Sequence, residues 1–289
     1  MMSMPIESIT DESDLIRAGF YWRENHNILG LVCTPIEQLG FTNAFSTRLG
    51  GVSPMPKGAL NLAGFNEDDA ENIYENRRRF LSLFDGDWRL ASCWQLHTAD
   101  VRAVKATDAV QPQNDRGDTI QCDALMTNIP RTFLGVKTAD CVPIILADKR
   151  TGACAAVHAG WRGTVASIVK QTLGRMADEY GTGSNDIRAA LGPAALACCY
   201  EVGEEVMEAF HKNFSNAASL FKETREGHAL VDLHRANREQ LIAAGVKSDR
   251  IFSAPLCTMC RTDLFFSYRR EKKVHGRVGR LMSVIGRTG

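Results

Sequence analysis

Residues 132–163 have the sequence TFLGVKTADCVPIILADKRTGACAAVHAGWRG, and the rest of the fold is predicted to build around them. This stretch holds three short apolar runs rich in β-branched residues, and the turn sequence at residues 148–152 separates the last two. This pattern predicts buried strands joined by a hairpin. Cys141 begins one strand of the hairpin and His158 ends the other, so an antiparallel pairing places them side by side. A thiolate beside an imidazole can be a nucleophile with its base or two ligands of one metal ion.

Composition limits the class of protein. The chain has 289 residues, 44% of them apolar, and Lys+Arg and Asp+Glu both number 34. A net charge of zero argues against a nucleic-acid partner. No apolar run is long enough to cross a bilayer, so we expect no membrane partner, and residues 1–14 lack a signal peptide. Nine scattered cysteines suit a reducing cytoplasm better than a disulfide framework.

The order of predicted elements indicates an α+β fold. Strands dominate the first half, and helices are predicted at residues 164–180, 203–214 and 233–244, without a steady alternation of strand and helix. This pattern favours mixed sheets over a doubly wound parallel sheet. We assign residues 1–27 to an N-terminal extension and residues 28–289 to one catalytic domain. The sequence leaves the oligomeric state open, with a monomer favoured.

Three candidate metal ligands lie at the ends of predicted strands: His97, Cys141 and His158. Two histidines and one cysteine with an open fourth position form a plausible catalytic zinc shell. The alternative is a buried structural cysteine with two hydrogen-bonded histidines. All three lie in short polar segments that interrupt apolar strands, where functional residues concentrate.

Two other segments have the chemistry to bind an anion. The loop at residues 46–53 combines Arg48 with Gly50-Gly51, and such glycines let backbone N–H groups approach a phosphate. Residues 261–280 carry eight Arg, Lys and His side chains. An ordinary surface loop and a solvated basic face are the respective alternatives.

Cysteines also occur close together near the end of the chain. Cys257 and Cys260 form a single C-x-x-C, whereas a zinc ribbon needs a second such pair. We therefore interpret this pair as two cysteines near a helix start. The adjacent pair Cys198-Cys199 is interpreted as packing.

Several motifs together resemble the YfiH-type family, which is labelled polyphenol oxidase or laccase domain and described as purine nucleoside phosphorylase. The resemblance covers nearly the whole chain after the N-terminal extension. The motifs that carry it are FSTRLGGVS (45–53), QLH (95–97), CDA (122–124), TADCVP (138–143), VHAGWRG (157–163), CYEV (199–202) and FSYRR (266–270).

The resemblance implies a single layered α/β domain with helices on the outside and a zinc-type site at His97, Cys141 and His158. It implies that purine nucleosides and inorganic phosphate are the substrates. Relatives are described as phosphorolysing adenosine, inosine and methylthioadenosine and as deaminating adenosine. Some bacterial members are described instead as amidases that edit a peptidoglycan precursor. The laccase label fits poorly, because the chain has seven histidines and no H-x-H pair; adventitious copper is possible at such ligands, but zinc is expected.

Residue chemistry suggests roles for the positions around the three ligands. We expect Arg48 and Gly50-Gly51 to bind phosphate, with Arg162 as a second candidate, and Asp123 and Asp140 to orient the ligands. A Cys–His hydrolase with Cys141 as its nucleophile is a rival interpretation. A non-catalytic nucleoside- or metal-binding protein is another.

Overall fold

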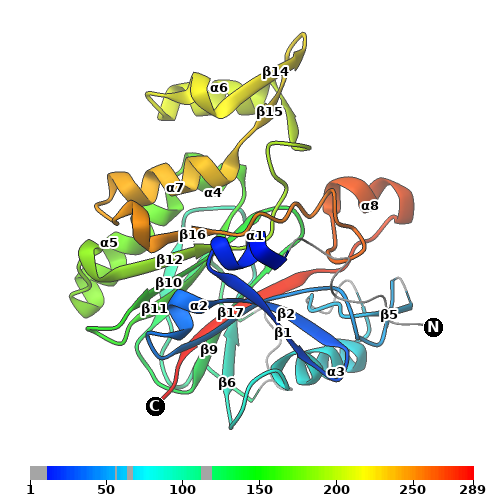
Figure 1. Ribbon diagram of the computed structural model, residues 1–289, viewed down its shortest axis with the longest axis vertical. Helices are drawn as coiled ribbons and strands as arrows, with labels where there is room; N and C mark the ends of the chain where they lie inside the picture. The colour runs from blue at the N-terminus through cyan, green and yellow to red at the C-terminus, as the bar shows by residue number, and fades with distance from the viewer. Residues whose placement is uncertain (1–11, 56, 64–67, 112–118) are drawn as a thin grey trace.

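Two stacked six-stranded sheets form the centre of the computed structural model, which describes residues 12–55, 57–63, 68–111 and 119–289 (Figure 1). The first sheet has the spatial order β1 (Phe20–Asn25), β2 (Ile28–Cys33), β3 (Phe41–Ser46), β17 (Leu281–Arg287), β9 (Thr132–Thr138) and β6 (Arg89–Ser92). The second has the order β16 (Ile251–Ser253), β12 (Ile187–Leu191), β10 (Val142–Asp148), β11 (Cys154–Ala159), β8 (Ala124–Thr127) and β7 (Val101–Ala103). Both contain parallel and antiparallel pairs, so the predicted α+β fold with mixed sheets is confirmed.

The main core lies between the two sheets. Leu134 of β9 and Ile145 of β10 belong to the same buried cluster between them. The alternate residues Ile144 and Leu146 belong to a second cluster, on the opposite face of β10. Because β9, β10 and β11 are buried along their whole length, their sequences are apolar runs without polar alternation.

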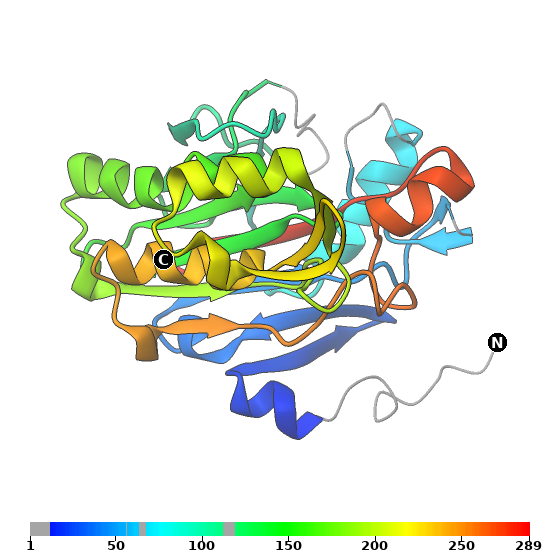
Figure 2. The same cartoon turned by 90° about the horizontal axis from the view of Figure 1, so that it is seen from above.

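Helices cover the outer faces of both sheets. On the first sheet lies α3 (Ala70–Leu81), and on the second lie α5 (Ile168–Tyr180) and α7 (Leu233–Ala243). Figure 2 shows the blue strands of the first sheet on one side of the green strands of the second. The other helices within the described ranges are α1 (Glu12–Arg17), α2 (Thr34–Glu37), α4 (Trp161–Val165), α6 (Glu204–Asn213) and α8 (Tyr268–His275), with 3₁₀ turns at Ser184–Asp186, Ala217–Leu220 and Ser248–Arg250.

Two small sheets complete the fold. Strands β4 (Ser53–Pro54) and β5 (Lys57–Ala59) form a pair, and β13 (Glu201–Gly203), β15 (His228–Val231) and β14 (Phe221–Arg225) form a three-stranded sheet. In Figure 1, α6, β14 and β15 lie together at the top, away from the two large sheets. No helix within the described ranges combines the length and apolar character that crossing a membrane requires.

Two predicted boundaries need correction. The helix predicted at residues 164–180 is divided into α4 and α5, because Ser167 takes a left-handed conformation with φ of 59°. The predicted extension at residues 1–27 contains α1 and β1, and β1 pairs with β2 along its length. Leu15 and Phe20 are buried in the main core, so the described part of this segment belongs to the folded domain.

The predicted hairpin brings two of the candidate ligands, Cys141 and His158, together at one end of strands β10 and β11 in the second sheet. Strands β10 and β11 are antiparallel, with Val142 opposite Ala159 and Pro143 opposite His158. The hairpin turn contains Gly152 at φ of 70°, a conformation that glycine adopts without strain. Strand β8 pairs with the other side of β11, and its first residue follows Asp123 directly. This register places Asp123 beside His158.

Candidate functional site

His97, Cys141 and His158 come together at this end of strands β10 and β11. Their ligand atoms all lie within 4.8 Å of one another, and Cys141 Sγ is 4.0 Å from His97 Nε2. The two imidazole rings meet edge to face, with their centroids 4.8 Å apart. His158 is buried, Cys141 is partly buried and His97 is exposed, so the cluster has one side open to solvent. The structure thus brings together the three predicted ligands.

Asp123 holds two of these ligands in place. Its buried carboxylate accepts a hydrogen bond of 2.8 Å from His158 Nδ1. It also accepts bonds from the backbone N–H groups of Leu96 (3.1 Å), His97 (3.0 Å) and Thr98 (2.8 Å), and one from the Thr98 hydroxyl (2.9 Å). The loop that carries His97 is therefore wrapped around one carboxylate. Since Nδ1 of His158 donates to Asp123, its Nε2 is the nitrogen left to face Cys141.

The charges of the site stabilise a thiolate. Burial opposes ionisation of Cys141, but the neighbouring His158 and His97 lower its pKa to about 6. Burial alone would lower the pKa of His158, but the Cys141 thiolate and Asp123 raise it to about 9. Burial likewise opposes ionisation of Asp123, yet its bonds with His158 and Thr98 lower its pKa to about 2. Asp123, His158 and Cys141 are thus arranged so that each group favours the charged form of its neighbour.

Asp140 directly precedes Cys141, and its side chain anchors this part of the loop. Its carboxylate accepts bonds from Thr258 Oγ1 (2.7 Å), Ser267 Oγ (3.0 Å) and Arg269 N (2.7 Å). Burial raises its pKa, although these bonds oppose the rise. Its backbone has φ of 86°, and His97 has φ of 60°. Left-handed backbone at two such non-glycine positions is typical of functional sites, where the surroundings fix a strained conformation.

A cavity of about 550 Å³ opens onto the three ligands. That volume is within the range of small-molecule sites. Four cationic side chains line it: Lys137, Arg162, Arg269 and Arg280. Four aromatic side chains line it as well: Trp94, Trp161, Tyr200 and Tyr268. Three guanidinium groups stack on aromatic rings, in the pairs Arg162–Trp161 (4.1 Å to the centroid), Arg269–Tyr200 (5.1 Å) and Arg280–Tyr268 (5.7 Å).

Of the predicted phosphate-binding residues, only Arg162 lines this cavity. Arg48 lines a second hollow instead, where its guanidinium pairs with Glu271 at 2.9 Å and donates to the carbonyl of Thr262. Sequence reasoning did not single out Lys137, Arg269 or Arg280 as site residues. The basic composition of residues 261–280 was a signal for the last two, but it did not show which side chains face the cavity.

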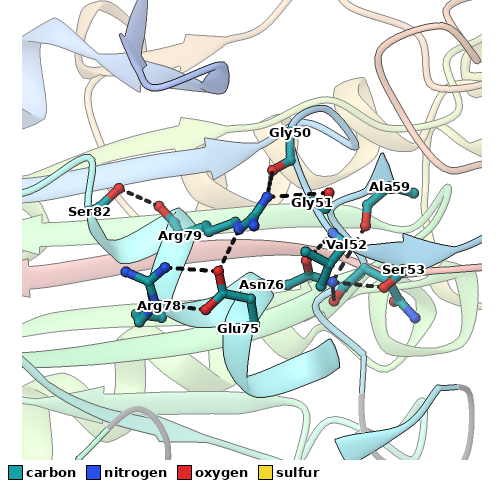
Figure 3. A network of polar contacts seen from close by, with 11 residues as sticks. Gly50, Gly51, Val52, Ser53, Ala59, Glu75, Asn76, Arg78, Arg79 and Ser82 are labelled. Atoms are coloured by element: carbon teal, nitrogen blue, oxygen red, sulfur yellow. Dashed lines mark hydrogen bonds and ion pairs between the residues drawn. The ribbon is translucent and has the colours of Figure 1, made fainter. Parts of the chain in front are cut away.

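The Gly50-Gly51 loop is held by side chains of α3, as Figure 3 shows. Arg79 donates to the carbonyls of both glycines, and Asn76 accepts from Val52 N at 2.9 Å. A side chain at Gly51 would place its Cβ 2.1 Å from the Ala59 carbonyl oxygen. Close packing against β5 therefore explains this glycine, and its binding of phosphate stays a prediction.

The three candidate ligands have the donor atoms and the spacing to hold one metal ion. A tetrahedral ion with these ligands separates sulfur from nitrogen by about 3.5 Å, close to the 4.0 Å between Cys141 and His97. Gly160 lies against the site, since a Cβ there would be 3.1 Å from both Cys141 Sγ and His97 Cδ2. Among the described histidines, only His97 and His158 belong to a candidate metal cluster, so the arrangement lacks the imidazoles that a multicopper centre needs.

The chain is similar to one protein family, to several relatives in sequence and to solved structures. Residues 42–288 match the family described as multi-copper polyphenol oxidoreductase laccase. A protein of Bacteroides thetaiotaomicron named purine nucleoside phosphorylase is 37% identical over 236 residues, 81% of this chain and 87% of its own. A protein of an unknown prokaryote named adenosine deaminase RL5 is 36% identical over 231 residues, covering 78% and 88%. The crystal structure of YlmD from Geobacillus stearothermophilus superposes with a TM-score of 0.85 at 33% identity, covering 94% and 99%.

Proposed function

This chain belongs to the family described as multi-copper polyphenol oxidoreductase laccase, and we propose that it is a purine nucleoside phosphorylase acting at the His97–Cys141–His158 site. The observation that carries the proposal is the single cavity that joins a three-ligand site to cationic and aromatic side chains. The proposed substrates are adenosine, inosine or methylthioadenosine with inorganic phosphate. The products are the free base and the corresponding ribose 1-phosphate.

The cavity supplies what phosphorolysis requires. The bond between C1′ and the purine nitrogen breaks, a bond from C1′ to a phosphate oxygen forms, and the purine takes up a proton. Arg269 and Arg280 are held by aromatic rings at the wall of the cavity, so they are positioned to bind phosphate with little loss of side-chain freedom. Arg162 is exposed, and its pairing with Glu205 is long at 3.3 Å, so an anion at the mouth of the cavity would compete with Glu205 for this guanidinium.

Aromatic side chains give the purine a place to stack. Tyr200 and Tyr268 line the cavity, and Tyr268 and Trp94 are both more than one-third exposed. Stacking on such rings is tolerant of substituents at C6, which fits a range of purine substrates. When bound, a zinc ion at the three ligands supplies Lewis acidity at an open coordination position. We propose a cytoplasmic location, because nine cysteines scattered along the chain suit a reducing compartment better than a disulfide framework.

Adenosine deamination is a second candidate activity, supported by the relative named adenosine deaminase RL5 and by the open side of the ligand cluster. In that reaction water replaces the amino group at C6 of adenine, and inosine and ammonia form. The same exposed side of the site would have to admit C6 for this activity and C1′ for phosphorolysis. The two activities are distinguished by whether phosphate is consumed.

Product analysis of adenosine incubated with the holoprotein, with and without phosphate, tests the proposal. We expect adenine that depends on phosphate, lost in Cys141→Ala and retained in Cys154→Ala, which removes a buried thiol on the same hairpin that belongs to neither candidate metal cluster. Inosine formed without phosphate supports deamination. If zinc-loaded protein forms neither adenine nor inosine, both proposed activities are refuted.

Alkylation separates the rival Cys–His hydrolase from a metal site. A nucleophilic Cys141 reacts with iodoacetamide in the protein as purified and needs no metal for activity. A metal-bound Cys141 is protected, and it reacts only after a chelator has removed the ion. Reaction at equal rates before and after chelation, with an amide substrate cleaved, would favour the hydrolase.

A further inference from the structure

Four cysteines from two distant segments meet at a second place in the fold. Cys198 and Cys199 lie in the turn after β12, and Cys257 and Cys260 lie in the turn after β16, where the orange segment of Figure 1 leads toward α8. All four Sγ atoms lie within 4.8 Å of one another. Cys260 Sγ is 3.7 Å from that of Cys198 and 3.1 Å from that of Cys199. The single C-x-x-C thus has a partner pair. Cys198-Cys199 is not merely packing, and Cys257 and Cys260 are not merely two cysteines near a helix start, because all four sulfurs meet at one place.

The separations match a tetrahedral metal site. Zinc–sulfur bonds of about 2.3 Å place the sulfurs of a tetrathiolate site about 3.8 Å apart. The sulfur–sulfur distances of 3.1 and 3.7 Å lie below that value, and the upper limit of 4.8 Å on the other sulfur–sulfur distances lies above it. We propose that Cys198, Cys199, Cys257 and Cys260 bind one zinc ion, at a structural site separate from the ligands His97, Cys141 and His158.

Disulfide formation explains this arrangement less well. A disulfide requires two sulfurs about 2.05 Å apart, and the closest pair here, Cys199 and Cys260, is separated by 3.1 Å. Pairing in disulfides brings sulfurs together two at a time, whereas here four converge on one point. The N–H of Leu196 also donates to Cys257 Sγ at 3.5 Å, an interaction that favours a thiolate. Cys198 and Cys260 are exposed, so an ion has access.

The site would fix one wall of the cavity. The segments it joins already touch at the bridge between Ala194 and Cys257, and Thr258 N donates to the Ala194 carbonyl at 2.9 Å. Thr258 Oγ1 bonds the Asp140 carboxylate, next to Cys141. Tyr200, which lines the cavity, follows Cys199 directly. The four cysteines are therefore positioning residues, and their zinc ion would keep Tyr200 and Thr258 in place.

Metal analysis of the dialysed holoprotein by mass spectrometry tests the proposal without reference to activity. We expect about two zinc ions per chain in the wild type and in Cys154→Ala. The double variant Cys198→Ser/Cys260→Ser, which changes two exposed positions, should retain about one. The variant Cys141→Ala should also retain about one. After replacement of zinc by cobalt, the thiolate-to-cobalt absorption should fall by most of its intensity in the double variant and by a smaller part in Cys141→Ala, because four thiolates contribute at one site and one at the other.

Three results would overturn the proposal. The first is a wild-type protein that binds one zinc ion per chain, with the same zinc content in the double variant. The second is a Cys199–Cys260 disulfide in the unreduced protein. The third is iron in place of zinc. If the double variant does not fold, the wild type still decides the question through its zinc content and its cobalt spectrum. Two zinc ions per chain without phosphorolysis would support this site while refuting the proposed function, so the two failures are distinguishable.

Discussion

Replacing Asp123 by asparagine should weaken both the fold and the metal site. An amide offers one acceptor oxygen where the carboxylate has two. If the NH2 group takes the Oδ2 position, the part-buried N–H groups of Leu96 and Thr98 lose their acceptor, and an unsatisfied N–H costs about 1–3 kcal/mol. If it takes the Oδ1 position, His97 N–H loses its acceptor and His158 must carry its proton on Nε2, which blocks metal binding at that nitrogen.

Either orientation leads to measurable losses. We expect the free energy of unfolding to fall by about 3 kcal/mol. The dissociation constant for zinc should rise about 10–100-fold, as for other residues that orient a histidine ligand. Urea unfolding measures the first quantity, and competition with a chromophoric chelator measures the second.

Asp100→Asn is the matched control. Asp100 lies in the same loop and is exposed, and its carboxylate accepts a bond from Thr98 Oγ1 at 3.1 Å. We expect changes of less than about 0.5 kcal/mol in stability and no change in zinc affinity. If Asp123→Asn bound zinc as tightly as this control, the inference that Asp123 orients His158 for the metal would be wrong.

Three further predictions concern other parts of the site and the core. In Gly160→Ala, the new Cβ lies 3.1 Å from Cys141 Sγ, so chelator competition should show zinc affinity about tenfold lower, and unchanged affinity would contradict the contact. Burial lowers the pKa of His234 from 6.5 to about 4. The unfolded chain therefore binds this proton more tightly than the folded chain, and the free energy of unfolding falls as the pH drops below 6.5. Urea unfolding should show about 2 kcal/mol lost between pH 8 and pH 5, and His234→Gln should not show this loss. In Arg269→Met, the KM for phosphate should rise at least about tenfold, whereas Arg270→Met, in the other hollow, should leave it unchanged.

The hairpin was predictable because its interactions are local. Strand ends and a five-residue turn are visible in one continuous stretch, and they fix the register that pairs Pro143 with His158. The buried strands were visible as apolar runs for the same reason. The break at Ser167 was not predictable, because the apolar periodicity of a helix continues across it and only the backbone conformation changes.

The missed features depend on contacts between distant segments. The four-cysteine cluster forms because β12 and β16 pair in parallel, which brings the turns after them together. Arg48 and the glycines beside it have the sequence pattern of a phosphate-binding loop, but Glu271 of α8 pairs with the Arg48 guanidinium. Neither relation leaves a local pattern in the sequence. Arg269 and Arg280 were likewise hidden within a basic segment whose other members face elsewhere.

Phosphorolysis at the His97–Cys141–His158 site is tested by ³¹P NMR of adenosine and inorganic phosphate incubated with the holoprotein. We expect phosphate to be consumed and ribose 1-phosphate to appear, one equivalent for each adenine released. With Cys141→Ala, the phosphate signal should stay unchanged and no ribose 1-phosphate signal should appear. Adenine release without loss of phosphate, or a ribose 1-phosphate signal that survives in Cys141→Ala, would contradict phosphorolysis at the His97–Cys141–His158 site.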